Sequence, residues 1–233
     1  MLAQPDLRIA RGAVSRKLPD MKTRVGSGLL LCALLICGCQ TASYWAWEKM
    51  GVYKRDLLKK NVVAARDDQK AASEQFKDAL TRLKELNSFQ GGNLEKVYSS
   101  LNRDYERSVE RANTVHKRVK DVETVSADLF REWEQEIKEI SSADLRDKSR
   151  QQLRETRQRY EELHSALKRA EQSMDPVLTR LHDQVLFLKH NLNAAAIASL
   201  KGESTNIQTE IGKLLEDMNA AIAQADKFIN TLK

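Results

Sequence analysis

The feature that most constrains this chain is the scarcity of helix-breaking residues across its last three quarters. Between residues 52 and 233 the only proline is Pro176. Glycine is almost as rare there and occurs at four positions: Gly91, Gly92, Gly202 and Gly212. Proline and glycine are the residues that most often interrupt a helix. So long a stretch with so few of them predicts long helices joined by short turns.

Hydrophobic spacing supports the same prediction. Apolar residues recur in alternating steps of three and four, which places them on one stripe of a helix and suits packing against neighbouring helices. The first stripe is Leu58, Val62, Ala65, Gln69, Ala72, Phe76, Ala79, Leu83 and Leu86. The second is Leu94, Tyr98, Leu101, Tyr105, Ser108, Ala112, Val115, Val119, Val122, Ser126, Leu129, Trp133, Glu136 and Ile140. The second stripe predicts a helix of about 45 residues, or roughly 70 Å at 1.5 Å per residue.

Two further stripes follow. We expect a turn at residues 141–144, with Ser142 or Asp144 as the N-cap, and a last turn at residues 201–204, after which Ser204 or Thr205 caps the final helix. The third stripe is Leu153, Thr156, Tyr160, Leu163, Leu167, Ala170, Met174, Val177, Leu181, Val185, Leu188, Leu192 and Ala195. The fourth is Ile207, Ile211, Leu214, Met218, Ala221, Ala225, Phe228 and Leu232.

Pro176 interrupts the third stripe, because proline lacks the N–H that a helix interior uses. Two successive steps of four, Val177–Leu181–Val185, also break the spacing just after it. Either the helix kinks there, which we favour, or Asp175 caps a new helix with Pro176 at its first position.

The predicted fold class is therefore all-α: an elongated antiparallel bundle or coiled coil of about four long helices. Since the second and third helices are the longest, we expect their hairpin around residues 130–155 to extend beyond the other two. The bundle domain spans residues 52–233.

The charge pattern argues against nucleic-acid binding. The chain has 39 basic and 33 acidic residues, but six of the basic and two of the acidic ones precede Cys39, so the remainder carries a net charge of only +2. Acidic and basic residues are interleaved there, whereas phosphate binding needs a concentrated basic face.

The N-terminal region has the pattern of a secretory leader. A basic segment from Met21 precedes an uncharged run from Val25 to Gly38, which is too short to span a membrane comfortably. We assign residues 1–38 to a signal peptide. Met21 is a better start than Met1, although a long basic region beginning at Met1 would also function.

The leader ends in Ile36-Cys37-Gly38-Cys39, which resembles the bacterial lipobox. The resemblance implies that a peptidase cuts between Gly38 and Cys39 and that the Cys39 thiol carries acyl chains such as palmitate. Each buried methylene contributes about 0.8 kcal/mol, so several chains hold a protein firmly in a membrane. By resemblance to lipoprotein sorting, Gln40 directs the protein to the outer membrane, facing the periplasm.

Residues 39–51 form the predicted tether between the anchor and the bundle. Tyr44, Trp45 and Trp47 follow the anchor closely, and amphipathic aromatic rings suit the headgroup zone of a membrane. They are candidates for the membrane interface, with packing against the bundle as the equal alternative.

Catalytic and metal-binding patterns are missing from the sequence. The four histidines form no His-Glu-x-x-His motif, and Glu161 with His164 is a single Glu-x-x-His pair where a bundle metal centre uses two. No cysteine follows Cys39, and there is no phosphate loop or Gly-x-Ser-x-Gly elbow. We predict a non-enzymatic protein without cofactor or metal.

Three stretches carry a wider resemblance: residues 44–55, the turn 89–98, and residues 129–133. They resemble a family of uncharacterised helical envelope proteins catalogued as a domain of unknown function, across residues 40–233. The resemblance supports class and location and brings no assigned activity. The expected function is a lipid-anchored periplasmic scaffold, spacer or partner-docking module, binding an envelope protein or a second copy of itself. The alternative is a helical-bundle enzyme or regulator that binds a metal or ligand in its interior.

Overall fold

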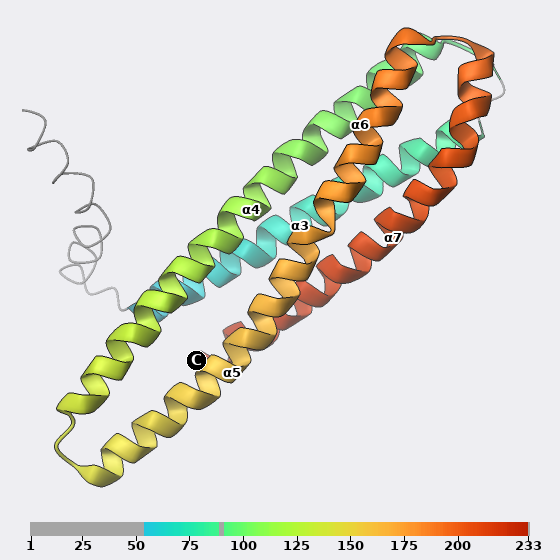
Figure 1. The fold of residues 1–233 in the computed structure, drawn as a ribbon. Helices are drawn as coiled ribbons and strands as arrows, with labels where there is room; N and C mark the ends of the chain where they lie inside the picture. The colour runs from blue at the N-terminus through green and yellow to red at the C-terminus, as the bar shows by residue number, and fades with distance from the viewer. Residues whose placement is uncertain (1–53, 89–90, 233) are drawn as a thin grey trace, which may run out of the picture. The chain divides into compact units, whose positions relative to one another are not determined.

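The computed structural model describes residues 54–88 and 91–232, which belong to one compact unit, Val52–Lys233. Every regular element in these residues is an α-helix: α3 (Lys54–Asn87), α4 (Leu94–Glu139), α5 (Ala143–Gln172), α6 (Met174–His190) and α7 (Ala194–Thr231). Figure 1 shows α6 continuing the path of α5, so the helices form four antiparallel columns. The predicted all-α bundle is confirmed.

The first two turns lie where the sequence placed them. Between α3 and α4, Gly91 and Gly92 adopt φ values of 140° and 137°, a conformation that side chains with a Cβ rarely adopt. Asn93 then caps α4 by accepting a hydrogen bond from the Lys96 backbone N–H at 3.0 Å. At the next turn the cap of α5 is Ser142, one of the two predicted candidates.

The predicted last turn at residues 201–204 is wrong. The chain turns ten residues earlier, and Asn193 caps α7 by accepting from the Ala196 backbone N–H at 2.9 Å. Gly202 lies inside α7, where it is exposed and where a Cβ atom would have no neighbouring atom within 4 Å. The stripe of the last helix therefore extends backward through Ser204, Leu200 and Ile197, which are buried, whereas Leu192 of the predicted third stripe is exposed.

The third predicted helix is interrupted three residues before Pro176. Helix α5 ends at Gln172, Ser173 separates it from α6, and Pro176 is the third residue of α6. Proline has no N–H to donate to the carbonyl of Gln172, four residues earlier, which explains why the interruption falls there. Asp175 is not the cap, so neither of the two sequence-based descriptions is complete: the path continues with a break at Ser173.

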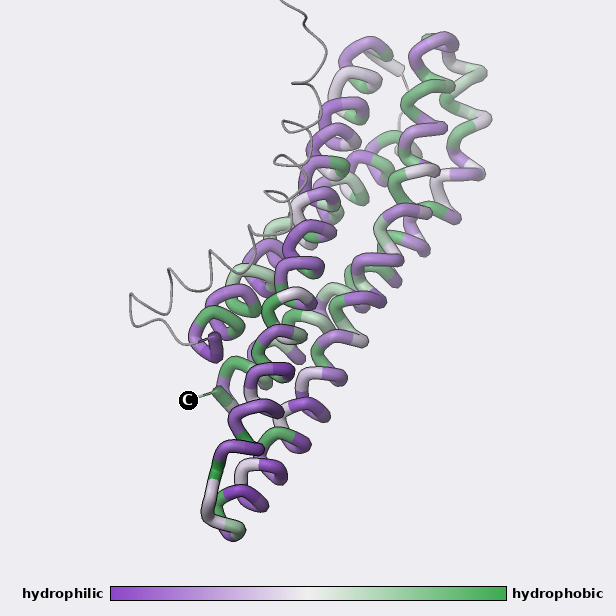
Figure 2. The backbone as a smooth tube through the Cα atoms, turned by 60° about the vertical axis from the view of Figure 1, so that its left-hand side comes forward, coloured by the Kyte–Doolittle hydropathy of each residue, from purple (hydrophilic) through white to green (hydrophobic). Residues whose placement is uncertain are grey.

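The core follows the predicted stripes closely. All nine predicted residues of the first stripe are buried in α3, and the predicted fourth stripe is buried from Ile207 to Leu232 in α7. Figure 2 shows hydrophobic and hydrophilic residues alternating along every helix, as this pattern requires.

The second stripe departs from the prediction near the end of α4. Beyond Ser126 the buried residues are Phe130 and Ile137, while Glu136 is exposed. An ion pair of 2.8 Å between Lys54 Nζ and Glu132 Oε1 places the start of α3 beside this part of α4. Past that point α4 packs against α5 without α3, so its buried face rotates toward α5.

The hairpin of α4 and α5 consequently extends beyond the first residue of α3 and the last residues of α7, as predicted (Figure 1). Its interior is aromatic: the rings of Phe130 and Tyr160 meet edge to face with centroids 5.4 Å apart. Among the described helices, none carries an apolar stretch long enough to cross a membrane.

Candidate functional site

The site residues proposed from the lipobox and from the aromatic cluster lie outside the described residues. These are Gly38, Cys39, Tyr44, Trp45 and Trp47. The described part begins at Lys54, fifteen residues after Cys39. Their assignments as cleavage site, lipidation site and membrane-interface residues therefore stay predictions.

The two ends of the described chain meet at one end of the bundle. Arg55 Nη2 of α3 donates to the backbone carbonyl of Leu232 at 3.1 Å. Lys54 pairs with Glu132 of α4 beside this contact. The first turn of α3 is thus joined to both α4 and the end of α7.

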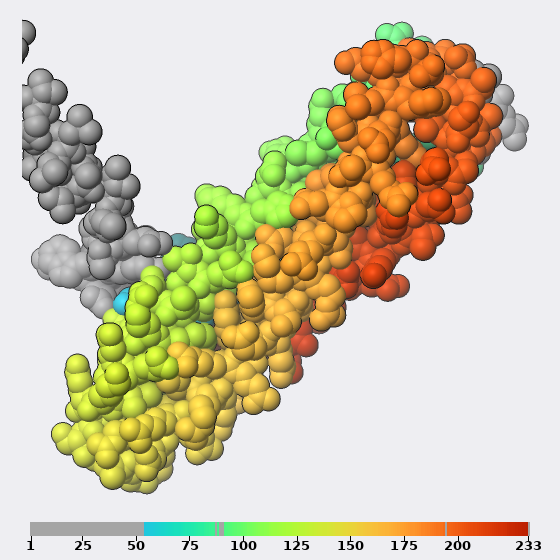
Figure 3. Space-filling model, in the orientation of Figure 1, coloured from blue at the N-terminus to red at the C-terminus, as the bar shows by residue number. Residues whose placement is uncertain are grey.

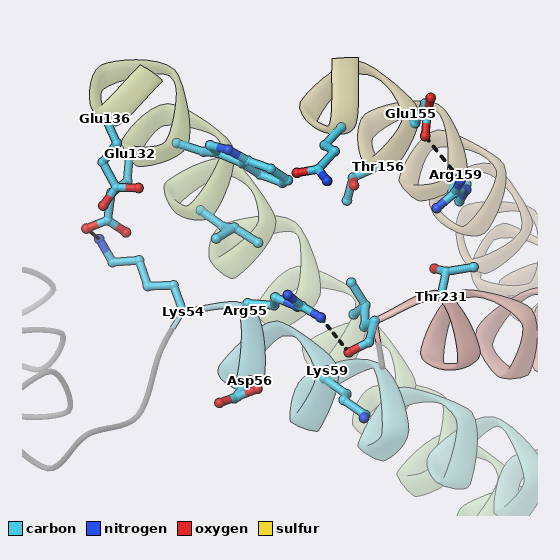
Figure 4. A pocket seen from close by; sticks show the side chains of 14 residues that line it. Lys54, Arg55, Asp56, Lys59, Glu132, Glu136, Glu155, Thr156, Arg159 and Thr231 are labelled. Atoms are coloured by element: carbon cyan, nitrogen blue, oxygen red, sulfur yellow. Dashed lines mark hydrogen bonds and ion pairs between the residues drawn. The ribbon is translucent and has the colours of Figure 1, made fainter. Parts of the chain in front are cut away.

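An open crevice of about 940 Å³ lies at the same end. Figure 4 shows its walls, which are the first turns of α3, the facing sides of α4 and α5, and the last residues of α7. The charged lining residues are Lys54, Arg55, Asp56, Lys59, Glu132, Glu136, Glu155 and Arg159. Two of these pairs are neutralised within the lining, Lys54 with Glu132 at 2.8 Å and Arg159 with Glu155 at 3.5 Å.

The apolar part of the crevice is formed by Leu129 and Trp133, which are both half-buried. The Trp133 indole N–H donates to Ser149 Oγ at 2.9 Å, and this bond fixes the ring across the α4–α5 hairpin. An immobilised aromatic surface flanked by charges is a common feature of sites that hold another protein segment.

The polar lining of the crevice is mixed in charge. Four basic and four acidic residues line it, and its only hydroxyls are those of Thr156 and Thr231. Among the described residues, the lining contains carboxylates, two lysines and two arginines, and no histidine or cysteine. A segment with both charge signs would match such a lining.

A second polar feature follows the contact of α4 with α5 and α6. His116 Nδ1 lies 3.0 Å from Glu171 Oε1, and its Nε2 lies 3.3 Å from Asp175 Oδ1 on the first turn of α6. Lys168 Nζ lies 2.5 Å from Glu171 Oε2. Burial alone would raise the pKa of the Glu171 carboxyl, but the hydrogen bonds from Lys168 and His116 outweigh it and hold the pKa below its ordinary value.

The pair Glu161 and His164, considered above as half of a metal motif, is not brought together as one. His164 Nε2 lies 2.7 Å from Glu123 Oε1 of α4 instead, and its ring stacks on Tyr160 at a centroid distance of 5.7 Å. Burial raises the pKa of the Tyr160 hydroxyl. Across the residues that the structure describes, no three His, Cys, Asp or Glu side chains converge as a metal site would require.

Sequence reasoning did not find the crevice. Its lining comes from four separate segments, residues 54–59, 129–136, 152–159 and 231–232, and most of these positions lie between the apolar stripes. Trp133 and Leu129 were placed in the second stripe, as core. The only available signal was that the α4–α5 hairpin is longer than the helices beside it.

The chain matches a known protein family. The model of a family described as "Protein of unknown function (DUF2959)" matches residues 43–232. The match covers the whole described bundle and part of the predicted tether. No curated protein matches the chain.

Proposed function

We propose that this chain, which belongs to the DUF2959 family of proteins of unknown function, is a lipid-anchored spacer and docking protein of the bacterial envelope. In this proposal the acyl chains on Cys39 hold it in the outer membrane, and the bundle stands in the periplasm. It binds partners through its surface and performs no chemistry of its own.

The observation that carries the proposal is the position of the chain's entry point. Lys54 follows Cys39 by fifteen residues and lies toward the α4–α5 hairpin end of the bundle, beside Glu132 and the end of α7, with the tip of the hairpin extending beyond it. A lipid anchor attached there leaves the opposite extremity, with the α3–α4 and α6–α7 turns, unattached (Figure 1). Helix α4, with 46 residues, separates the two extremities by roughly 70 Å at 1.5 Å per residue.

Lipidation is tested by growing cells with radiolabelled palmitate and separating their inner and outer membranes. We expect label in the wild-type protein, in the outer-membrane fraction, and none in Cys39→Ala. The matched control is Cys37→Ala, which removes a neighbouring thiol, leaves the small residue before the cut unchanged, and should keep the label. Equal labelling of the wild type and Cys39→Ala, or no label in either, would overturn the anchor.

We further propose that the crevice near Lys54 holds a partner segment. The lining offers Trp133 as a fixed apolar surface and charges of both signs around it, and the crevice lies at the anchored extremity. Docking there is tested by placing a photo-crosslinking amino acid at Gln152, which lines the crevice, and at Gln151, an equally exposed neighbour that does not. Adducts at residue 152 alone support docking; equal adducts, or none, contradict it.

A further inference from the structure

A groove of about 520 Å³ opens between α6 and α7, near the α6–α7 turn. Figure 3 shows the surface hollowed between the two helices in this region. The apolar lining residues are Phe187 of α6 with Leu200 and Ile207 of α7. Leu200 and Ile207 are buried, whereas the Phe187 side chain is 39% exposed at the edge.

A buried amide faces this groove without a hydrogen-bond partner. Gln184 of α6 is 3% exposed and lines the groove, yet neither its Nε2 nor its Oε1 is hydrogen-bonded within the described part of the chain. Leaving a buried polar group unpaired is unfavourable, so such groups in native proteins usually have a partner. The groove is the side from which a partner can reach Gln184.

The outer face of α6 beside the groove carries an exposed stripe, in which two apolar residues lie between two polar ones. Asp183, Leu186, Phe187 and His190 are all exposed and follow the spacing of one helix face, i, i+3, i+4 and i+7. Leu186 and Phe187 are 41% and 39% exposed, and Leu192 in the adjoining turn is 44% exposed. Three of the four large exposed hydrophobic side chains in the described residues therefore gather at this end of the α6–α7 pair, and the fourth, Leu145, lies in the other hairpin.

On α7 the groove is lined by Ser199, Leu200, Glu203 and Ile207, and further small residues lie on the exposed face beside Ser199. Ala195, Ala198, Ser199 and Gly202 are exposed and share one helix face by the same spacing. Small side chains allow another helix to approach closely. Together, the exposed Leu186 and Phe187 on α6, the small exposed residues of α7 beside the groove and the unpaired Gln184 amide between the helices form a surface that fits an α-helix.

The order of charges along the α6 stripe indicates which kind of helix can bind there. Asp183 lies at one end of the exposed α6 stripe, while Lys189 and His190 lie at the other. None of these three side chains has an ion-pair partner elsewhere in the described residues. An acidic end and a basic end flanking two apolar residues make the stripe complementary to itself in the reversed direction.

We propose that this surface binds a second copy of the same chain, with each α6 lying antiparallel to the other and seated over the other's α6–α7 groove. A two-fold axis between Leu186 and Phe187 places Leu186 opposite the partner's Phe187 and Asp183 opposite the partner's His190. Such a contact is isologous, so both pairs occur twice. A parallel arrangement would instead place Asp183 against the partner's Asp183, which like charges disfavour. Self-pairing does not require the lipid anchor, so it can fail while the proposed function holds.

The contact is tested by cysteine cross-linking of the full chain with Cys32, Cys37 and Cys39 replaced by serine, so that an introduced thiol is the only one. Leu186→Cys and Phe187→Cys lie next to the axis and should give a disulfide-linked dimer on mild oxidation. Asp183→Cys should give little, because two copies of residue 183 would lie about 10 Å apart along the helices, beyond the roughly 7 Å Cα separation that a disulfide spans. Leu145→Cys is the matched control, since Leu145 is 57% exposed in the other hairpin and should not cross-link.

A charge exchange then distinguishes self-pairing from binding of an unrelated helix. In the Leu186→Cys background, Asp183→Lys and His190→Asp should each reduce the dimer yield several-fold. The two together should restore it, because the partner's residue 190 then carries the charge that residue 183 needs. Failure of the double variant to recover, or equal cross-linking at residues 145 and 186, would overturn the proposal. Circular dichroism of each variant establishes that the helices are intact.

Discussion

The α3–α4 pair and the α6–α7 pair are both antiparallel and follow the same spacing of apolar residues, yet α3 and α4 contact each other far more extensively than α6 and α7 do. In α3 every predicted stripe residue is buried, and Asp68–Arg118 at 2.8 Å and Arg82–Asp104 at 3.0 Å bridge α3 to α4. Between α6 and α7, Gln184 is unpaired and Phe187 is half exposed beside an open groove. Periodic spacing thus gives an extensive contact where both helices are long and uninterrupted, and a smaller, more open one where a short helix follows a break.

The largest contrast should appear when a phenylalanine is truncated in each pair. Phe76 in α3 is fully buried, so Phe76→Ala should lower the free energy of unfolding by about 3–5 kcal/mol through lost burial and a residual cavity. Phe187→Ala should cost less than about 1 kcal/mol, because that ring is partly in water in a single copy. Urea unfolding followed by circular dichroism gives both values. Equal losses would remove the distinction between the two pairs.

Buried amides sharpen the comparison, because one lies in each pair. Gln69 in α3 is fully buried and, like Gln184, has no hydrogen-bond partner among the described residues. Gln69→Leu should raise the free energy of unfolding by about 1–2 kcal/mol, since it removes an unpaired polar group from a packed stripe. The exposed Gln158→Leu is the control and should change it by less than about 0.5 kcal/mol. A destabilised Gln69→Leu would indicate that the amide has a partner in solution.

The position of the α6–α7 turn gives a smaller effect. Asn193→Ala should cost about 1 kcal/mol of unfolding free energy, because it removes the side chain that caps α7. Thr205→Ala should stay within about 0.5 kcal/mol, since Thr205 is exposed in the interior of α7. The two values come from the same unfolding experiment. A larger loss of unfolding free energy for Thr205→Ala than for Asn193→Ala would indicate that the last turn lies at residues 201–204 instead.

The smallest effect concerns Glu171, at the junction of α5 and α6. Its pKa in the folded protein lies below the ordinary value of 4.5, because Lys168 and His116 donate to it. The carboxylate therefore adds stability above that ordinary value, and the contribution is lost as the pH falls through the lower, folded value. The melting temperature of Glu171→Gln should lie below that of the wild type at pH 7, and the difference should shrink below about pH 4. A pH-independent difference would contradict this ion-pair role.

Most of the fold could be predicted because burial and spacing agree in the long helices. Heptad spacing alone was enough to predict the buried stripe from Leu58 to Leu86. The last turn was misplaced because Gly202 resembles a helix terminator, although it lies on an exposed face where a helix tolerates it. Better evidence for the position of the turn was that Ile197, Leu200 and Ser204 continue the spacing of the stripe that begins at Ile207.

The crevice and the groove could not be predicted, since each depends on where helices end relative to one another. The sequence placed Glu136 in the second apolar stripe. The structure shows that α3 begins beside Glu132, so beyond that point α4 packs against α5 without α3. Gln184 lies outside the predicted third stripe, and its burial without a hydrogen-bond partner appears only in the structure. Side-chain spacing within one helix does not contain this information.

The most direct test of an end-tethered spacer uses the two exposed leucines at opposite extremities. Leu145→Cys and Leu192→Cys are labelled with a donor fluorophore in purified, lipidated protein, and energy transfer is measured to an acceptor in the vesicle membrane. The residues are separated by roughly 70 Å along the bundle, from the length of α4 at 1.5 Å per residue. We expect strong transfer from residue 145 and weak transfer from residue 192. Equal transfer from both, or stronger transfer from residue 192, would contradict anchoring at the Lys54 end.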